Sequence, residues 1–214
     1  MTRLVLFDVD LTLIASNGVG SAALTTAFLE VLGVELDRST FDFQGRTDRS
    51  IQRELARRAG VLPAYEERRD RLVESYLGHL VGEVERRPPR LLPGVFEAVL
   101  RLEAEGLAVG LVTGNVERGA RIKLAPTGLD PHFPAGGFGD RHEERADVVR
   151  EAIAACSARS GDTFDPADVV VVGDTERDLW AGRDAGTRTV GVATGSRPVA
   201  WLADCGAGLV LEDL

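Results

Sequence analysis

Short apolar runs that stop abruptly at polar residues recur along the chain. They lie at residues 4–7, 108–112, 169–172, 189–192 and 208–211, with a weaker one near Gly137. Continuous apolar runs of this length are typical of strands that are buried on both faces of a parallel sheet. The pattern therefore predicts a parallel sheet built from most of the chain.

Helical periodicity fills stretches that lie between these runs. Apolar residues spaced three and four positions apart predict helices over 96–105, 146–158 and 178–185, the first with Phe96, Val99, Leu100 and Leu102 on its apolar face. Strands that alternate with helices predict an α/β fold with a doubly wound, Rossmann-like parallel sheet.

The first two strands are separated by too much sequence for a single crossover. Only helical patterns lie between them, over residues 22–32, 48–59 and 64–84. Pro88 and Pro89 end the last of these, because proline cannot continue a helix. We therefore predict a catalytic core of residues 1–17 and 88–214, with residues 18–87 inserted as a helical cap domain.

Composition and charge mainly exclude classes of partner and site. The net charge of −9 argues against a nucleic-acid partner, and the Arg-rich stretch 53–71 alternates with acidic residues as solvated helix faces do. No apolar run is long enough to span a membrane and no signal peptide is recognisable, which predicts a cytoplasmic protein without a membrane partner. Cys156 and Cys205 predict neither a disulfide nor a zinc site.

Polar side chains follow three of the predicted strands, at the point where each strand ends. They are Asp8 and Asp10, Thr113 and Asn115, and Asp174 and Asp178. Ligands of doubly wound sheets bind at this carboxyl edge. Several carboxylates gathered there would repel one another unless a cation lay between them, and ligands that are all oxygen favour Mg²⁺ over zinc.

These residue types suit phosphoryl transfer. A carboxylate can attack a phosphoryl group and form an aspartyl-phosphate. A second carboxylate two residues further on can protonate the leaving alcohol and later activate water. Hydroxyl and amide groups, with backbone N–H groups after a strand, can hold the phosphate oxygens.

Three segments carry a resemblance to a known family. Residues 8–12 (DVDLT), 113–115 (TGN) and 173–178 (GDTERD) resemble, in order, motifs I, II and IV of the haloacid dehalogenase superfamily, and the chain is most similar to its phosphoglycolate phosphatase-like branch. The resemblance implies a Mg²⁺-dependent phosphomonoester hydrolase that acts on a small phosphorylated metabolite through an aspartyl-phosphate, with phosphoglycolate as one candidate.

The resemblance also implies roles for individual residues. Asp8 would be the nucleophile and a metal ligand, and Asp10 the general acid and base, its backbone carbonyl also binding Mg²⁺. Asp174 and Asp178 would complete the metal site. The phosphate would be bound by Thr113, Gly114 and Asn115, together with a cation.

The chain departs from the family pattern at two places. Leu11 stands where many members have glycine. The lysine expected shortly before motif IV is missing, and Arg145 stands at about its place, whereas Lys123, the only lysine in the chain, follows motif II. Either can neutralise phosphate. The sequence narrowly favours Lys123, and the other cation is then expected to be an exposed charge without effect.

The turn at residues 45–48 has two interpretations. Gly45 permits an unusual backbone angle and Asp48 can cap the helix that follows, which describes a plain turn. Alternatively, the turn faces the carboxyl edge of the sheet, and Arg46 contacts the part of the substrate that is not transferred, since its fork suits a carboxylate.

Other functions remain to be weighed. A phosphotransferase or mutase of the β-phosphoglucomutase type keeps the second carboxylate of motif I, and a catalytically silent binding protein on the same fold is a further alternative. Dehalogenating and phosphonate-cleaving branches lack that carboxylate, so Asp10 argues against them. A signalling receiver domain is disfavoured because its phosphorylated Asp ends a middle strand.

Overall fold

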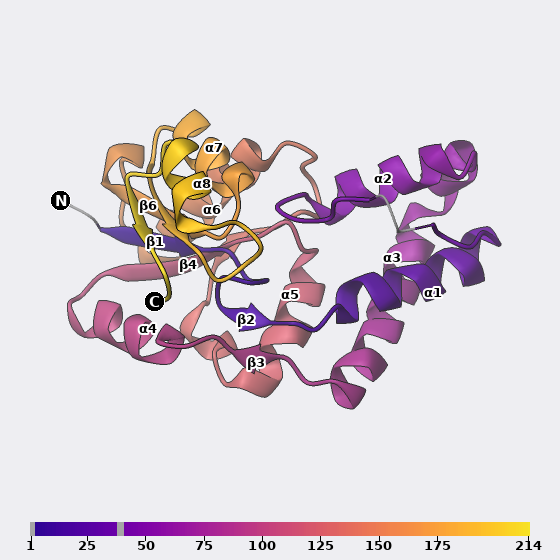
Figure 1. The fold of residues 1–214 in the computed structure, drawn as a ribbon, viewed down its shortest axis with the longest axis horizontal. Coiled ribbons are helices and arrows are strands. Elements are labelled where there is room, and N and C mark those ends of the chain that lie inside the picture. Colours follow the sequence, from indigo (N-terminus) through magenta and orange to yellow (C-terminus); the bar gives the residue numbers. More distant parts are fainter. Residues whose placement is uncertain (1–2, 38–40) are drawn as a thin grey trace.

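A six-stranded parallel sheet forms the centre of the larger of two lobes (Figure 1). The computed structural model describes residues 3–37 and 41–214. In spatial order the strands are β5 (Gly136–Gly137), β4 (Ala108–Val112), β1 (Leu4–Phe7), β6 (Val169–Gly173), β7 (Arg188–Val192) and β8 (Leu209–Leu211). Every neighbouring pair is parallel. The predicted α/β fold is confirmed, including the weak strand at the sheet edge.

Helices cover both faces of this sheet. They are α4 (Val95–Ala104), α5 (Glu117–Leu124), α6 (Arg145–Ser160), α7 (Glu176–Asp184) and α8 (Val199–Asp204). Side chains of β1 alternate between the faces, as the pleat requires. Val5 and Phe7 pack with α4 and α5, whereas Leu4 and Leu6 pack with α6 and α7. The central strand is thus buried on both sides, as its continuous apolar sequence predicts.

The apolar face predicted for α4 is partly wrong. Phe96 and Leu100 are exposed, at 38% and 42%, whereas Val95 and Val99 are buried. The helix turns Val95, Val99 and Leu102 toward the sheet, a stripe with the same spacing but shifted by one residue.

Three helices form the smaller lobe, to the right of the sheet in Figure 1. They are α1 (Val19–Leu32), α2 (Asp48–Arg58) and α3 (Leu62–Arg86). Their apolar faces share a separate hydrophobic cluster, which includes Phe28, Leu55, Tyr65 and Tyr76 and which Val116 of the larger lobe joins. Burial of these large side chains stabilises the lobe mainly through its own contacts.

A two-stranded antiparallel ribbon connects the lobes. β2 (Ile14–Ala15) pairs with β3 (Arg90–Leu91), so the chain leaves for the smaller lobe and returns from it at one place (Figure 1). The sequence did not predict this ribbon, because a two-residue strand has no periodicity to recognise.

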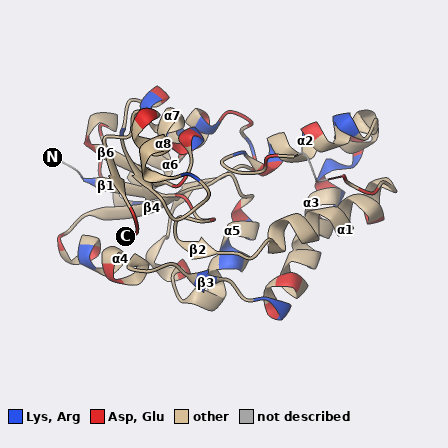
Figure 2. Cartoon of the chain, viewed as in Figure 1, with Lys and Arg blue, Asp and Glu red and all other residues tan. Residues whose placement is uncertain are grey.

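Basic and acidic residues are interleaved along the helices and loops of both lobes (Figure 2). In the Arg-rich stretch, Arg57 and Arg58 both pair with Glu54, and Arg53 pairs with Glu66. The prediction of a solvated helix face is confirmed. Of the helices in residues 3–37 and 41–214, none is long and apolar enough to cross a membrane. Cys156 and Cys205 are free cysteines.

Candidate active site

The sheet register brings the predicted strand ends together. Phe7 at the end of β1 lies opposite Leu111 on β4 and Val172 on β6, so Asp8 emerges between the ends of two neighbouring strands. The carboxyl edge forms the floor of a cavity of about 420 Å³, and α1, α2 and the residues before α2 form its roof. The predicted site residues lining it are Asp8, Asp10, Arg46, Thr113, Gly114, Asn115, Lys123, Arg145 and Asp174.

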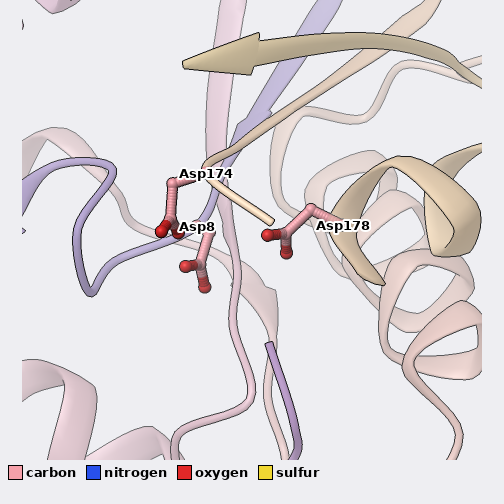
Figure 3. A group of neighbouring side chains, drawn as sticks. All are labelled: Asp8, Asp174 and Asp178. Atoms are coloured by element: carbon pink, nitrogen blue, oxygen red, sulfur yellow. The ribbon is translucent and has the colours of Figure 1, made fainter. Parts of the chain in front are cut away.

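Three buried carboxylates form an acidic cluster at this edge. Oxygen atoms of Asp8, Asp174 and Asp178 lie within 4.8 Å of one another (Figure 3). Burial, reinforced by Asp178 and Asp8, raises the pKa of Asp174 to about 9. Burial also raises the pKa of Asp8 to about 7, although Arg145 opposes the shift. The cluster is therefore costly to ionise unless a cation offsets its charge.

One oxygen of the cluster is well suited to a metal ion. Oδ2 of Asp174 is buried without a hydrogen-bond partner among the described residues. An unpaired buried carboxylate oxygen is destabilising. Three carboxylates at this spacing are the hard oxygen ligands that divalent cations such as Mg²⁺ prefer, so the residues present fit a divalent metal site.

Asp178 combines a structural contact with its place in the cluster. Its Oδ2 accepts hydrogen bonds from the Thr175 hydroxyl at 2.6 Å and the Thr175 backbone N–H at 3.1 Å, and the Asp178 N–H donates to the Thr175 hydroxyl at 3.4 Å, which completes a capping box at the start of α7. Its other oxygen pairs with Arg145. The helix cap thus fixes the carboxylate and points one oxygen at its neighbours.

Arg145, the first residue of α6, brings a cation to Asp8. Its Nη2 lies 2.8 Å from Asp8 Oδ1 and also pairs with Asp178. The Arg145 side chain is only 9% exposed, so little water screens these pairs.

Lys123 on α5 reaches the second carboxylate instead. Its Nζ donates to Asp10 Oδ2 at 2.7 Å and to Asn115 Oδ1 at 2.6 Å. The Asn115 amide donates to the same Asp10 oxygen at 2.8 Å and to the Thr113 hydroxyl at 2.7 Å. Burial pushes the pKa of Asp10 upward, but Lys123, Ser16 and Asn115 outweigh it and hold that pKa below its ordinary value.

The site therefore contains both candidate cations. The expectation that one of them is an exposed charge is wrong, because Lys123 and Arg145 are 4% and 9% exposed. Arg145 contacts Asp8 and Lys123 contacts Asp10, so each carboxylate of motif I has a cation of its own.

The turn before α2 lies against the carboxyl edge. Gly45 has φ of +63°, and an added Cβ would lie 2.4 Å from the Thr175 hydroxyl, so the position requires glycine on both counts. Arg46 lines the cavity, with its guanidinium 5.4 Å from the centre of the Phe41 ring. Of the two interpretations of this turn, the geometry matches the one in which it faces the site.

Asp48 does not cap α2, contrary to the sequence interpretation. Thr47 is the cap, and its hydroxyl accepts a hydrogen bond from the Ser50 N–H at 3.2 Å. The Asp48 carboxylate instead accepts from the Val116 N–H of the larger lobe at 2.9 Å. A cap and a residue just after it look alike in sequence, because both favour small polar or acidic side chains.

Comparison with known proteins assigns the family. Residues 5–192 match the model of haloacid dehalogenase-like hydrolases. The chain belongs to this family.

Its relatives in this hydrolase family include phosphatases. A phosphoglycolate phosphatase of Agrobacterium fabrum is 29% identical over 199 residues, which cover 91% of this chain and 82% of that protein. An N-acetylmuramic acid 6-phosphate phosphatase of Pseudomonas putida is 32% identical over 120 residues, or 54% of this chain and 52% of that one. The predicted enzyme class, a phosphoric monoester hydrolase, is confirmed.

A solved structure shows the same fold. A hydrolase from Pseudomonas syringae superposes with a TM-score of 0.74 at 24% identity, covering 100% of this chain and 94% of that one. The two-lobed arrangement is thus one that this hydrolase shares with an experimentally determined structure.

Leu11, where many family members have glycine, has φ of +62°. The left-handed region is unfavourable for a leucine by roughly 1–2 kcal/mol. Two hydrogen bonds hold the residue there, from its own N–H to Ile14 O at 2.8 Å and from the Thr194 hydroxyl to its carbonyl at 2.5 Å.

The sequence analysis missed the loop that follows β7. An added Cβ on Gly195 would lie 1.9 Å from Asp174 Oδ2, so this backbone packs directly against the acidic cluster. The signal was present, because Thr194, Gly195 and Ser196 follow an apolar strand in the same way as the three motifs do.

Proposed function

We propose that the protein is a Mg²⁺-dependent phosphomonoester hydrolase that acts on a small phosphorylated metabolite through an aspartyl-phosphate on Asp8. One observation carries the proposal. At the floor of a cavity of about 420 Å³, Asp8 shares a metal-type cluster with two further carboxylates, while Asp10 lies two residues away beside a separate cation. This arrangement supplies a nucleophile, a proton carrier and a cation site at one edge.

The metal would be held by Asp8, Asp174 and Asp178, with the backbone carbonyl of Asp10 as a further oxygen ligand. When bound, Mg²⁺ would offset the negative charge of the carboxylates and of the phosphate as they approach each other.

The chain's own residues carry the bond changes. A carboxylate oxygen of Asp8 attacks phosphorus, and the bond from phosphorus to the leaving oxygen breaks as Asp10 donates its proton to that oxygen. Approach of the phosphate dianion favours the protonated form of Asp10, as a nearby like charge does. Asp10 then removes a proton from the water that attacks phosphorus, which releases inorganic phosphate and regenerates Asp8.

The remaining site residues position the phosphate. Arg145 would offset its charge beside Asp8, and Lys123 with Asn115 would hold Asp10 in place while facing the same cavity. The Thr113 hydroxyl and the backbone N–H groups of Gly114 and Asn115 would bind the phosphate oxygens.

We assign substrate choice to residues 18–87, interpreted as a cap domain. Among the described residues of this segment, Arg46 is the cation that lines the cavity, and it would bind a carboxylate on the leaving group. A leaving group of this kind occurs in phosphoglycolate, and the relative from Agrobacterium fabrum is named for hydrolysing it. Phosphoglycolate is therefore the first substrate to test.

Phosphate release from phosphoglycolate, sugar phosphates and an aryl phosphate tests the proposal. Asp8→Asn should abolish turnover, and Asp10→Asn should slow it by on the order of 10²–10⁴. Asp184→Asn, which changes an exposed carboxylate on α7, should behave as wild type. Excess chelator should stop the reaction, Mg²⁺ should restore it and Ca²⁺ should do so poorly.

Three outcomes would contradict this assignment. Turnover by Asp8→Asn would mean that another group is the nucleophile, and full activity in chelator would exclude the metal. Retention of the phosphoryl group on a sugar, without release of phosphate, would favour the mutase alternative.

A further inference from the structure

The turn from β6 into α7 presents side chains in two directions. Asp174 and Asp178 point to the acidic cluster. Between them, Thr175 packs against Gly45, and Nη1 of Arg177 donates to Asp42 Oδ2 at 2.9 Å and to the backbone carbonyl of Gln44. The segment that carries two carboxylates of the cluster therefore also binds residues 41–48, which we call the roof loop.

Further contacts hold the roof loop at both ends. Near its start, the Ser196 hydroxyl donates to the Gln44 side-chain oxygen at 2.7 Å. At its end, the Asp48 backbone N–H donates to Gly114 O at 2.6 Å. Arg46 lies between these anchors and lines the cavity. The position of the roof over Asp8 thus depends on contacts with the larger lobe.

We propose that Arg177 is a positioning residue of this hydrolase, which docks the roof loop on the turn that carries Asp174 and Asp178. The inference deepens the proposed function, since it takes the cavity as the active site. Arg177 touches none of the reacting groups and acts through the loop. The same turn carries two carboxylates of the acidic cluster and the contacts that bind the roof loop. The turn therefore fixes the position of the roof loop relative to the cluster.

The two acceptors of Arg177 differ in strength. Asp42 is 48% exposed, and an ion pair in water contributes little. The carbonyl of Gln44 is less exposed to water and receives a hydrogen bond from a charged donor, which is stronger than a neutral one. Removal of Arg177 should therefore have a larger effect than removal of the Asp42 charge.

Kinetics of four variants test the docking role. Arg177→Ala should raise KM about two- to tenfold and change kcat less than about twofold, because saturating substrate restores the position of the roof loop and the reacting groups are untouched. Asp42→Asn, which keeps the turn acceptor for the Gln44 N–H, should raise KM less, and the double variant should match Arg177→Ala. Arg177→Lys should recover part of the loss.

Arg183→Ala provides the matched control. Arg183 lies on the same helix, is 67% exposed, and has its neighbour Asp184 at 3.7 Å as ion-pair partner. Its removal should leave KM and kcat unchanged. Equal effects of Arg177→Ala and Arg183→Ala would show that only surface charge matters, and would overturn the proposal.

Hydrogen exchange supplies a readout that needs no activity. In Arg177→Ala, amides of residues 42–48 should exchange several-fold faster, including that of Asp48, while the melting temperature stays within about 2 °C of wild type. Unchanged exchange would refute docking by Arg177. Faster exchange in a protein that hydrolyses no phosphomonoester would support the docking and reject the proposed function.

Discussion

Replacing Lys123 by methionine tests whether Lys123 compensates the charge of the Asp10 carboxylate. Lys123 and Asp10 are 5% and 31% exposed, and their atoms lie 2.7 Å apart. Removing one partner of a buried pair costs about 3–5 kcal/mol, because the remaining charge is left uncompensated. Asp10 keeps some access to the cavity, so we expect about 3 kcal/mol, or a fall in melting temperature of about 6–12 °C for a protein of this size.

The loss of stability caused by Lys123→Met should become smaller as the pH falls. In the wild type the pKa of Asp10 is below its ordinary value, so the pair contributes fully at neutral pH and is lost only as the pH falls below about 4. In the variant, burial acts without opposition from Lys123, which raises that pKa above the unfolded value. The deficit in stability of the variant relative to the wild type should therefore shrink between pH 7 and pH 5; the wild type is the reference because the other buried carboxylates titrate in both proteins.

Thermal denaturation at the two pH values measures both effects. Arg118→Met is the matched control, since Arg118 lies on the same helix and is 65% exposed. Its melting temperature should shift by no more than about 2 °C. Two results would refute the argument that Lys123 compensates the charge of Asp10. One is that Lys123→Met has the same melting temperature as Arg118→Met at pH 7. The other is that its melting temperature stays equally far below that of the wild type down to pH 5.

The other predictions concern the remaining anchors of the site. Arg145→Ala should lower kcat on the order of 10²- to 10³-fold in phosphate-release assays, and Arg145→Lys should recover only part, because the shorter lysine must bring its single ammonium to the place where Arg145 Nη2 contacts both Asp8 and Asp178. Gly195→Ala should weaken Mg²⁺ binding about 10- to 100-fold by calorimetry, since its Cβ would displace Asp174; unchanged affinity would contradict this. Arg46→Ala should lower kcat/KM about tenfold to a hundredfold for phosphoglycolate but little for a neutral aryl phosphate, and equal losses would leave Arg46 without a role in substrate choice.

The strands and their carboxyl-edge residues could be predicted because both depend on local sequence. A short apolar run buried on both faces has few alternatives to a parallel strand. Once such strands are paired in register, Asp8 and Asp174 must lie at one edge. The contents of the acidic cluster thus follow from the sequence and from the geometry of a parallel sheet.

The sequence identifies the two candidate cations, but it does not show which carboxylate each of them contacts. Lys123 and Arg145 are long side chains on helices, and the atom that each reaches depends on the rotation and depth of its helix against the sheet. Both rotations are set by apolar packing: Ala120 and Leu124 are buried on either side of Lys123, and Val148 and Val149 follow Arg145. Since the sequence gives the apolar stripe but not its exact phase, as α4 also illustrates, the choice between Asp8 and Asp10 could not be made.

Contacts between the lobes are the least predictable part of the site. Arg177 and Asp42 are 135 residues apart, and neither belongs to a periodic pattern that would mark it. Their pairing depends on the placement of one lobe on the other, which the interlobe contacts themselves determine. These residues are nevertheless informative, because their contact joins the roof loop to the turn that carries Asp174 and Asp178 without involving the proposed reacting groups.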